Sequence, residues 1–199
     1  MSKSIDFFET QFRQQVDGGE LPLNPFETRA LPHLRGRVLD FGCGLGNLAV
    51  AAARQGCRVL ALDGAPTAVE HLKQRAAAES LPIEAAVADL RDYPIDGDFD
   101  AVVCIGLLMF FDCAAARRQL ARLQACVRPG GVVVVNVLIE GTTFRAMFDP
   151  DGHCLFGRTE LVRAFAGWEI IDQAWEDFPA PGDTRKAFAT LVARRPASP

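Results

Sequence analysis

The chain has 199 residues, of which 49% are hydrophobic and 23% charged, and its formal net charge is −4. This hydrophobic content excludes a largely disordered chain, and a chain of this length can bury a core without disulfides or a structural metal. Acidic and basic residues are interspersed, whereas proteins that bind nucleic acid through a basic face cluster their lysines and arginines. We therefore expect a small-molecule partner and no nucleic acid.

No internal repeat, low-complexity stretch or linker divides the sequence, and its length is typical of one domain. The longest apolar run, residues 101–111, is shorter than the roughly 20 residues that cross a bilayer. The first residues lack the charged and apolar regions of a secretory signal. We expect a single domain with no membrane partner and, by default, a cytoplasmic location; no particular oligomeric state is indicated.

The six cysteines form no C-x-x-C pair and have no histidine at the spacing of zinc ligands. Several of them fall inside apolar runs. We expect reduced, buried thiols that pack as small hydrophobic side chains, and no metal site.

The first predicted element is a helix over residues 4–16, where apolar side chains recur at helical spacing. A loop containing prolines leads from it to a strand over residues 37–41. A glycine turn separates this strand from an alanine-rich helix over residues 46–55. A second strand is predicted over residues 58–63.

The next predicted helix has Pro66 in its first turn. Strands follow over residues 84–87 and 100–104, and the second is continuously apolar, as is typical of a parallel strand covered on both faces. Asp112 is placed to cap a further helix. A strand over residues 132–138 then returns to the sheet.

An irregular segment over residues 140–157 precedes a short helix near residues 159–165. The last two strands are predicted over residues 169–177 and 187–193. This alternation of strands and helices indicates a three-layer α/β sandwich around a mainly parallel sheet. Ligands of such sheets bind beyond the carboxyl ends of the strands.

The sharpest motif is the glycine turn after the first strand, Asp40-Phe41-Gly42-Cys43-Gly44-Leu45-Gly46. Glycines permit positive φ angles there and let a ligand approach the backbone. A dinucleotide fingerprint, G-x-G-x-x-G, would have its third glycine where this chain has Asn47. The charge of Asp40 would also oppose a pyrophosphate but suits a cationic ligand. The turn therefore favours a nucleoside without phosphates.

Two more carboxylates end the following strands. Asp63 is placed to accept hydrogen bonds from ribose hydroxyls, and Asp89 could accept one from the exocyclic amine of an adenine. Each acid alone is more often a helix cap or a turn former. Together with Asp40 they occupy three successive strand ends, which favours a nucleoside site.

With Pro129-Gly130-Gly131, these motifs make residues 37–138 resemble a class I S-adenosylmethionine-dependent methyltransferase. The shorter motifs Leu108-Met109-Phe110-Phe111 and Gly167-Trp168-Glu169 are similar to the tellurite-resistance (TehB-like) group. The resemblance implies a Rossmann-like sheet of seven strands in the order 3-2-1-4-5-7-6, with strand 7 antiparallel, preceded by an N-terminal helical segment. Residues 1–36 would then form a helix or lid, and residues 139–199 the substrate loop and C-terminal strands.

The resemblance also implies S-adenosyl-L-methionine as the cofactor. The three glycines of the turn would lie against its methionine part, Asp63 would bind the ribose, Asp89 with Leu90 would hold the adenine, and Ile105 would offer backbone contacts. The cofactor-binding residues expected in this way are Asp40, Gly42, Gly44, Gly46, Asp63, Gly64, Asp89, Leu90 and Ile105.

Aromatic side chains outside the core are the candidates for a substrate pocket. Phe12 could lie over the cofactor on a helical lid, with Gly18-Gly19 as its hinge. Phe144 and Phe148, in the irregular segment, could attract a sulfonium or a cationic substrate. Ordinary packing is the alternative for each of them.

His153 is the best candidate for a general base among the three histidines, and Arg185 is a candidate for positioning an anion. The TehB-like group carries a His-Arg pair before its last strand, whereas residues 178–186 contain no histidine here. Arg185 or Lys186 could supply the cation instead. A thiolate or selenolate acceptor needs no general base, whereas an oxygen or nitrogen acceptor often does.

The sequence thus predicts an enzyme that transfers a methyl group from S-adenosylmethionine to a small molecule, with a thiol or a chalcogen oxyanion among the acceptors considered. One alternative is a catalytically inactive protein of the same fold that binds the cofactor as a sensor or partner. An NAD-dependent oxidoreductase is disfavoured by Asn47 and Asp40.

Overall fold

The computed structural model describes residues 3–17, 22–149 and 152–197. Its centre is a seven-stranded sheet in the order β3-β2-β1-β4-β5-β7-β6. β7 is antiparallel to both of its neighbours, and the strands from β3 to β5 are parallel. The expected strand order and the antiparallel strand are therefore confirmed. The strands are β1 Arg37–Phe41, β2 Arg58–Asp63, β3 Ile83–Val87, β4 Phe99–Ile105, β5 Val127–Leu138, β6 Glu169–Ala180 and β7 Thr184–Arg194.

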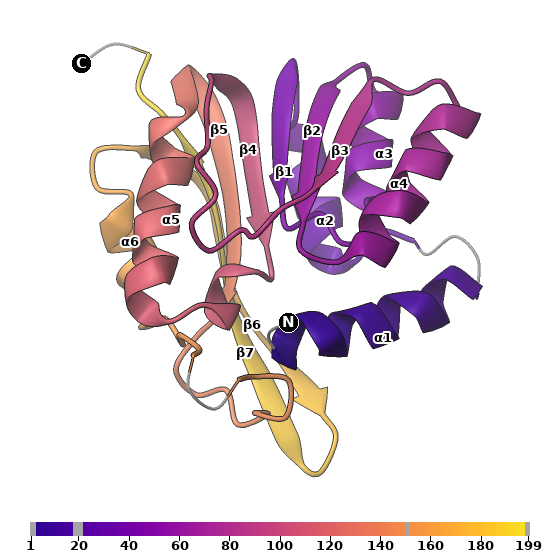
Figure 1. Ribbon diagram of the computed structural model, residues 1–199. Helices are drawn as coiled ribbons and strands as arrows, with labels where there is room; N and C mark the ends of the chain where they lie inside the picture. The colour runs from indigo at the N-terminus through magenta and orange to yellow at the C-terminus, as the bar shows by residue number, and fades with distance from the viewer. Residues whose placement is uncertain (1–2, 18–21, 150–151, 198–199) are drawn as a thin grey trace.

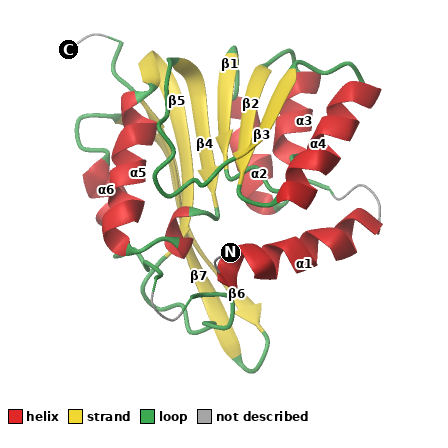
Figure 2. Ribbon diagram, in the orientation of Figure 1, coloured by secondary structure: helices red, strands yellow, loops and turns green. Residues whose placement is uncertain are grey.

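Helices cover both faces of the sheet, so the expected three layers are present (Figures 1 and 2). Across the end at which the parallel strands finish lies α1, a separate helix. None of the helices in the described ranges has both the length and the apolar character that crossing a bilayer requires. The helices are α1 Lys3–Asp17, α2 Pro25–Ala30, α3 Asn47–Arg54, α4 Pro66–Ala78, α5 Cys113–Ala125 and α6 Glu160–Ala164, with short 3₁₀ turns at Leu31–His33 and Leu108–Phe110.

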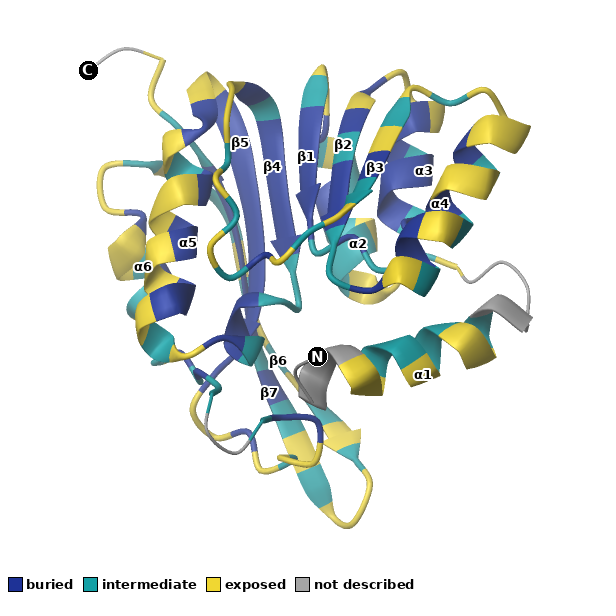
Figure 3. Cartoon of the chain, viewed as in Figure 1, coloured by how far each residue is buried: buried dark blue, intermediate teal, exposed yellow. Residues whose placement is uncertain are grey.

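The core lies on both faces of the central strands, which Figure 3 shows as buried. Successive valines of β5 point to opposite faces: Val133 packs in the cluster on one face and Val134 in the cluster on the other. Both are fully buried. Burial on both faces explains why this strand reads as a continuous apolar run rather than as an alternating one.

Most predicted elements are found within a few residues of their expected bounds, but α2 was expected to be a loop. Asn24 Oδ1 accepts hydrogen bonds from the backbone N–H groups of Phe26 and Glu27, both at 2.9 Å. Glu27 Oε2 accepts one in return from the Asn24 N–H at 2.8 Å. This capping box, with Pro25 at the first helical position, starts a helix where the prolines suggested a loop.

β5 begins before the Pro-Gly-Gly motif rather than after it. The motif lies within the strand, at an irregularity in its pairing with β4. The register between β4 and β5 shifts between Phe99 and Ala101. A side chain at Gly131 would meet backbone oxygens of Arg128 and Asp100 at 2.9 Å, so this position has no room for a Cβ. The glycine therefore lets the two backbones approach within the ladder.

β6 and β7 are longer than expected because they form a hairpin that extends beyond the end of the parallel strands (Figure 1). The connecting turn has two consecutive residues with positive φ, Gly182 at 72° and Asp183 at 54°. Such a pair matches the right-handed twist of a hairpin. The hairpin brings the start of β7 to the same end of the sheet as α1.

The expectation of six reduced thiols is wrong for two of them, since Cys113 and Cys154 form a disulfide. Cys113 is the first residue of α5, and the Cys154 N–H donates to the Met109 carbonyl at 3.0 Å, which holds Cys154 beside the 3₁₀ turn that precedes α5. The pair is 41 residues apart, a separation that carries no sequence signal. The other cysteines, Cys43, Cys57, Cys104 and Cys126, are free and buried.

Candidate cofactor and acceptor site

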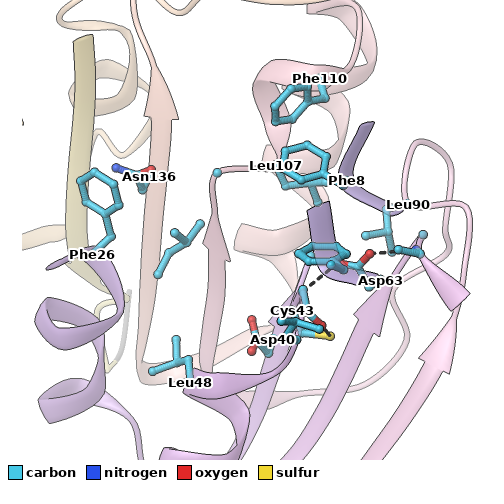
Figure 4. Close-up of a pocket in the computed structure, with 18 of the residues that line it drawn as sticks. Phe8, Phe26, Asp40, Cys43, Leu48, Asp63, Leu90, Leu107, Phe110 and Asn136 are labelled. Carbon is cyan, nitrogen blue, oxygen red and sulfur yellow. Dashed lines mark hydrogen bonds between the residues drawn. The ribbon is translucent and has the colours of Figure 1, made fainter. Parts of the chain in front are cut away.

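A cavity of about 440 Å³ lies at the carboxyl ends of β1, β4 and β5, with α1 across its mouth (Figures 1 and 4). Its wall combines the glycine turn, side chains of α1 and α2, and the start of β7. The wall includes every residue expected to bind the cofactor: Asp40, Gly42, Gly44, Gly46, Asp63, Gly64, Asp89, Leu90 and Ile105.

The glycine turn needs glycine at its two ends for steric reasons. Gly42, Gly44 and Gly46 all have positive φ angles, 87°, 51° and 74°. A Cβ at Gly46 would meet Leu72 at 2.5 Å, and one at Gly42 would meet Leu107 at 3.0 Å. The turn therefore presents bare backbone to the cavity.

Asp63, the last residue of β2, holds the glycine turn in place (Figure 4). Its Oδ2 accepts the N–H of Gly44 at 2.8 Å, and its Oδ1 accepts the N–H of Ala65 at 2.9 Å. Burial raises the pKa of Asp63, and the backbone hydrogen bonds oppose that shift. Each carboxylate oxygen keeps acceptor capacity for a hydroxyl in the cavity.

Asp40 is the buried carboxyl of the site, with 4% of its surface exposed. Its Oδ2 has no hydrogen-bond partner. Burial, followed by the charges of Glu27 and Asp63, raises the pKa of Asp40 to about 8. A cationic group in the cavity would compensate this carboxylate, as the sequence led us to expect.

The opposite rim is formed by the segment after β3. The side chain of Asp89 is largely exposed and accepts the N–H of Arg91 at 3.1 Å, while Leu90 is buried. The Leu90 carbonyl accepts a hydrogen bond from Gln119 at 2.6 Å, which fixes the backbone at this rim.

α1 closes the cavity from outside through aromatic side chains. Phe12 packs over the glycine turn so closely that a Cβ at Gly44 would lie 3.3 Å from its ring. Phe8 stacks on Phe12 and meets the ring of Phe110 edge-on, with centroids 5.0 Å apart. Glu9 accepts a hydrogen bond from Thr67 of α4. Phe12 thus lines the cavity, while the hinge expected at residues 18–19 lies outside the described residues.

The four other candidates do not line the cavity. Phe148 is buried and stacks on His153, whose Nε2 lies 3.0 Å from a guanidinium nitrogen of Arg145. Phe144 lies under Lys186, and Arg185 donates through Nε to the Gly141 carbonyl at 3.0 Å. The catalytic roles expected for His153 and Arg185 stay predictions.

Asn136 and Glu27 line the cavity but were missed from the sequence. Asn136 follows the apolar run Val132-Val133-Val134-Val135 and is itself followed by three apolar residues, so a polar residue inside an apolar strand was the available signal. Glu27 was the third helical residue of an N-P-F-E pattern, which is the signature of a capping box.

Residues 38–131 match a family of methyltransferase domains. The chain is 30% identical over 141 residues to a protein named hemagglutinin 1 from Eikenella corrodens, an alignment that covers 68% of this chain and 44% of the relative. It is 31% identical over 135 residues to a ubiquinone biosynthesis O-methyltransferase from Xanthomonas campestris pv. campestris, covering 62% and 54%. The chain therefore spans about half the length of these curated relatives.

Solved structures show the same fold. TehB from Haemophilus influenzae superposes with a TM-score of 0.78 at 18% identity, covering 96% of this chain and 67% of TehB. The N-methyltransferase NodS from Bradyrhizobium japonicum, solved with S-adenosylhomocysteine, superposes with a TM-score of 0.71 at 19% identity, covering 98% and 99%. The fold is therefore the class I methyltransferase fold, similar to that of TehB.

Proposed function

We propose that this chain, which carries a methyltransferase domain of the class I fold, transfers the methyl group of S-adenosylmethionine to a small-molecule acceptor. The observation that carries the proposal is the arrangement of the glycine turn, which Asp63 holds against the cavity beside the buried carboxyl of Asp40, whose Oδ2 has no hydrogen-bond partner. This arrangement lies within the part of the chain that matches the methyltransferase family.

The residues of the cavity fit this cofactor. Asp40 has an unpaired buried oxygen for a positively charged group, and the oxygens of Asp63 have acceptor capacity for the ribose hydroxyls. The glycine turn leaves room for the methionine part, with Ile105 and Gly64 beside it. Asp89 and Leu90 form the rim where we place the adenine. When bound, the cofactor supplies a methyl group made electrophilic by its sulfonium.

The protein's contribution to such a transfer is alignment and exclusion of water. Apolar side chains from α1 and the segment after β4, among them Phe8, Leu107 and Phe110, face the cavity (Figure 4). Holding two reactants in line can lower a barrier by about 7–11 kcal/mol. A closed, apolar wall also prevents water from taking the methyl group.

Which atom of the substrate receives the methyl group depends on the bases that the cavity offers. Among the described residues, its titratable lining consists of carboxylates, Cys43, Arg91 and Lys186 rather than histidine. Thiols and chalcogen oxyanions, which need no general base, are therefore among the acceptors, and the carboxylates of the lining could take up the proton of a hydroxyl or amino acceptor. For an oxygen or nitrogen acceptor we propose His153 as the base and Arg185 as the residue that positions an anion, although neither lines the cavity.

Calorimetric titration with S-adenosylhomocysteine, S-adenosylmethionine and NAD tests the cofactor. We expect saturation by the first two ligands only, and saturation by NAD alone would overturn the proposal. Incubation with S-adenosylmethionine and a panel of thiols, oxyanions, amines and phenols then tests transfer. Binding without transfer to any member would favour a cofactor-binding sensor of the same fold.

A further inference from the structure

One part of the cavity is formed outside the glycine turn, and we call it the acceptor lobe: Phe26, Asn136, Leu138, Lys186 and Phe188. Figure 4 shows Asn136 beside Phe26, on the side of the cavity away from Asp63. β5 and β7 are paired there, with Asn136 opposite Thr190 and Leu138 opposite Phe188. Because side chains alternate along a strand, the β5 and β7 members of the lobe share one face of the sheet.

Asn136 presents an unsatisfied acceptor to this lobe. It is fully buried, and its Nδ2 donates to the Thr190 hydroxyl at 2.9 Å. Its Oδ1 has no hydrogen-bond partner. A buried acceptor without a partner destabilises the folded chain, so a ligand that donates a hydrogen bond to it would recover that cost.

Lys186 presents a cation to the same lobe. Among the described residues, no carboxylate lies within ion-pairing distance of its amine, which instead lies 4.9 Å from the centre of the Phe144 ring. The side chain is partly buried, and this burial lowers the pKa of Lys186. An anion in the cavity would supply the missing partner and favour the charged amine.

Aromatic surface separates these two polar groups. Lys186 and Thr190 are four residues apart on β7, a distance of about 13 Å at a rise of about 3.3 Å per residue. Phe188 lies between them on the same face, and its ring packs against that of Phe26 with centroids 4.8 Å apart. A flat ligand lying on Phe188 could reach the flexible amine at one end and Asn136 at the other.

We propose that the acceptor is an aromatic carboxylate that also carries a hydroxyl, amino or thiol group. Its carboxylate pairs with Lys186, its ring lies against Phe188, and its proton-bearing group donates a hydrogen bond to Asn136 Oδ1. When that group is methylated, its proton passes to a carboxylate of the cavity lining. This assignment rests on the proposed methyltransferase function and names the substrate class of the same site.

The test measures binding of matched probes to protein saturated with S-adenosylhomocysteine. The probes are 4-hydroxybenzoate, its uncharged methyl ester, and benzoate, which lacks the hydroxyl. We expect 4-hydroxybenzoate to bind at least tenfold more tightly than either of the others. Lys186→Met should abolish the preference over the ester, and Asn136→Leu the preference over benzoate. Lys73→Met, which changes an exposed lysine on α4, should retain both preferences.

Affinity for S-adenosylhomocysteine distinguishes a wrong acceptor assignment from a wrong methyltransferase function. Lys186→Met and Asn136→Leu leave the glycine turn unchanged, so both variants should bind S-adenosylhomocysteine as tightly as the unmodified chain. That binding would also establish that the variants are folded. Equal affinities for the acid and its ester, or no binding of the acid, would overturn the assignment of the lobe alone. Failure of the unmodified chain to bind S-adenosylhomocysteine would overturn the proposed function itself.

Discussion

Asp63 links the end of β2 to the glycine turn through two backbone hydrogen bonds, one from Gly44 and one from Ala65. Asp63→Ala removes these bonds and the proposed contacts to the ribose. We expect its affinity for S-adenosylhomocysteine to fall by about 1.5–3 kcal/mol, because charge-assisted hydrogen bonds are lost. Calorimetry measures this change, and Asp96→Ala, at an exposed loop position, serves as the control. Unchanged affinity in Asp63→Ala would place the ribose elsewhere.

Asp40 makes stability depend on pH, because burial raises its pKa from 3.8 to about 8. Between these values the folded chain holds a proton that the unfolded chain releases, so the contribution of Asp40 to stability falls as the pH rises. Asp40→Asn removes this dependence. Urea unfolding from pH 5 to pH 8 should show the variant gaining stability relative to the unmodified chain as the pH rises. A constant difference between the two proteins would contradict the assigned pKa.

Some residues of the candidate site are marked by a contiguous sequence pattern, and others are brought to the site only by long-range strand pairing. The glycines, Asp40 and Asp63 could be predicted because the end of a strand and the turn after it are contiguous in the sequence. Asn136 and Lys186 come together only through the pairing of β5 with β7, which no local pattern specifies. Phe148 and His153 were candidates by residue type, but they pack against each other instead of lining the cavity.

At the scale of elements, the disulfide joins the start of α5 to the loop of residues 140–157. Breaking it releases a loop that spans 41 residues, so we expect the free energy of unfolding to fall by about 2–4 kcal/mol. Thermal unfolding with and without a phosphine reductant measures the loss. Cys113→Ser with Cys154→Ser should be destabilised to the same extent and should no longer respond to the reductant. A response that persists in this double variant would contradict the pairing.

The elements that the sequence predicted best are those whose pattern is set by burial alone. β1 and β2 have the predicted bounds, because their apolar runs end where the turn residues begin. α2 escaped prediction because six residues are too few to show a helical period, and only its capping box marks it. The hairpin of β6 and β7 was predicted too short because its outer half alternates between partly exposed and exposed residues.

In the whole molecule, the cavity is lined partly by the matched methyltransferase domain and partly by elements outside it. The matched domain supplies the glycine turn and the carboxylates at the strand ends, where we place the cofactor. α1, α2, β7 and the end of β5 lie outside the matched residues and supply Lys186, Asn136 and the aromatic side chains Phe8, Phe12, Phe26 and Phe188. We infer that the choice of acceptor resides in these outer elements, whereas the family resemblance concerns the cofactor.

Transfer of a labelled methyl group tests the proposed function most directly. The chain is incubated with S-adenosylmethionine that carries a trideuterated methyl group and with the acceptor panel, and products are identified by mass spectrometry. We predict a product heavier by the labelled methyl group, formed together with S-adenosylhomocysteine and strongly diminished in Asp63→Ala. Saturable cofactor binding without any labelled product across the thiols, oxyanions, amines, phenols and aromatic carboxylates would contradict the proposed methyl transfer.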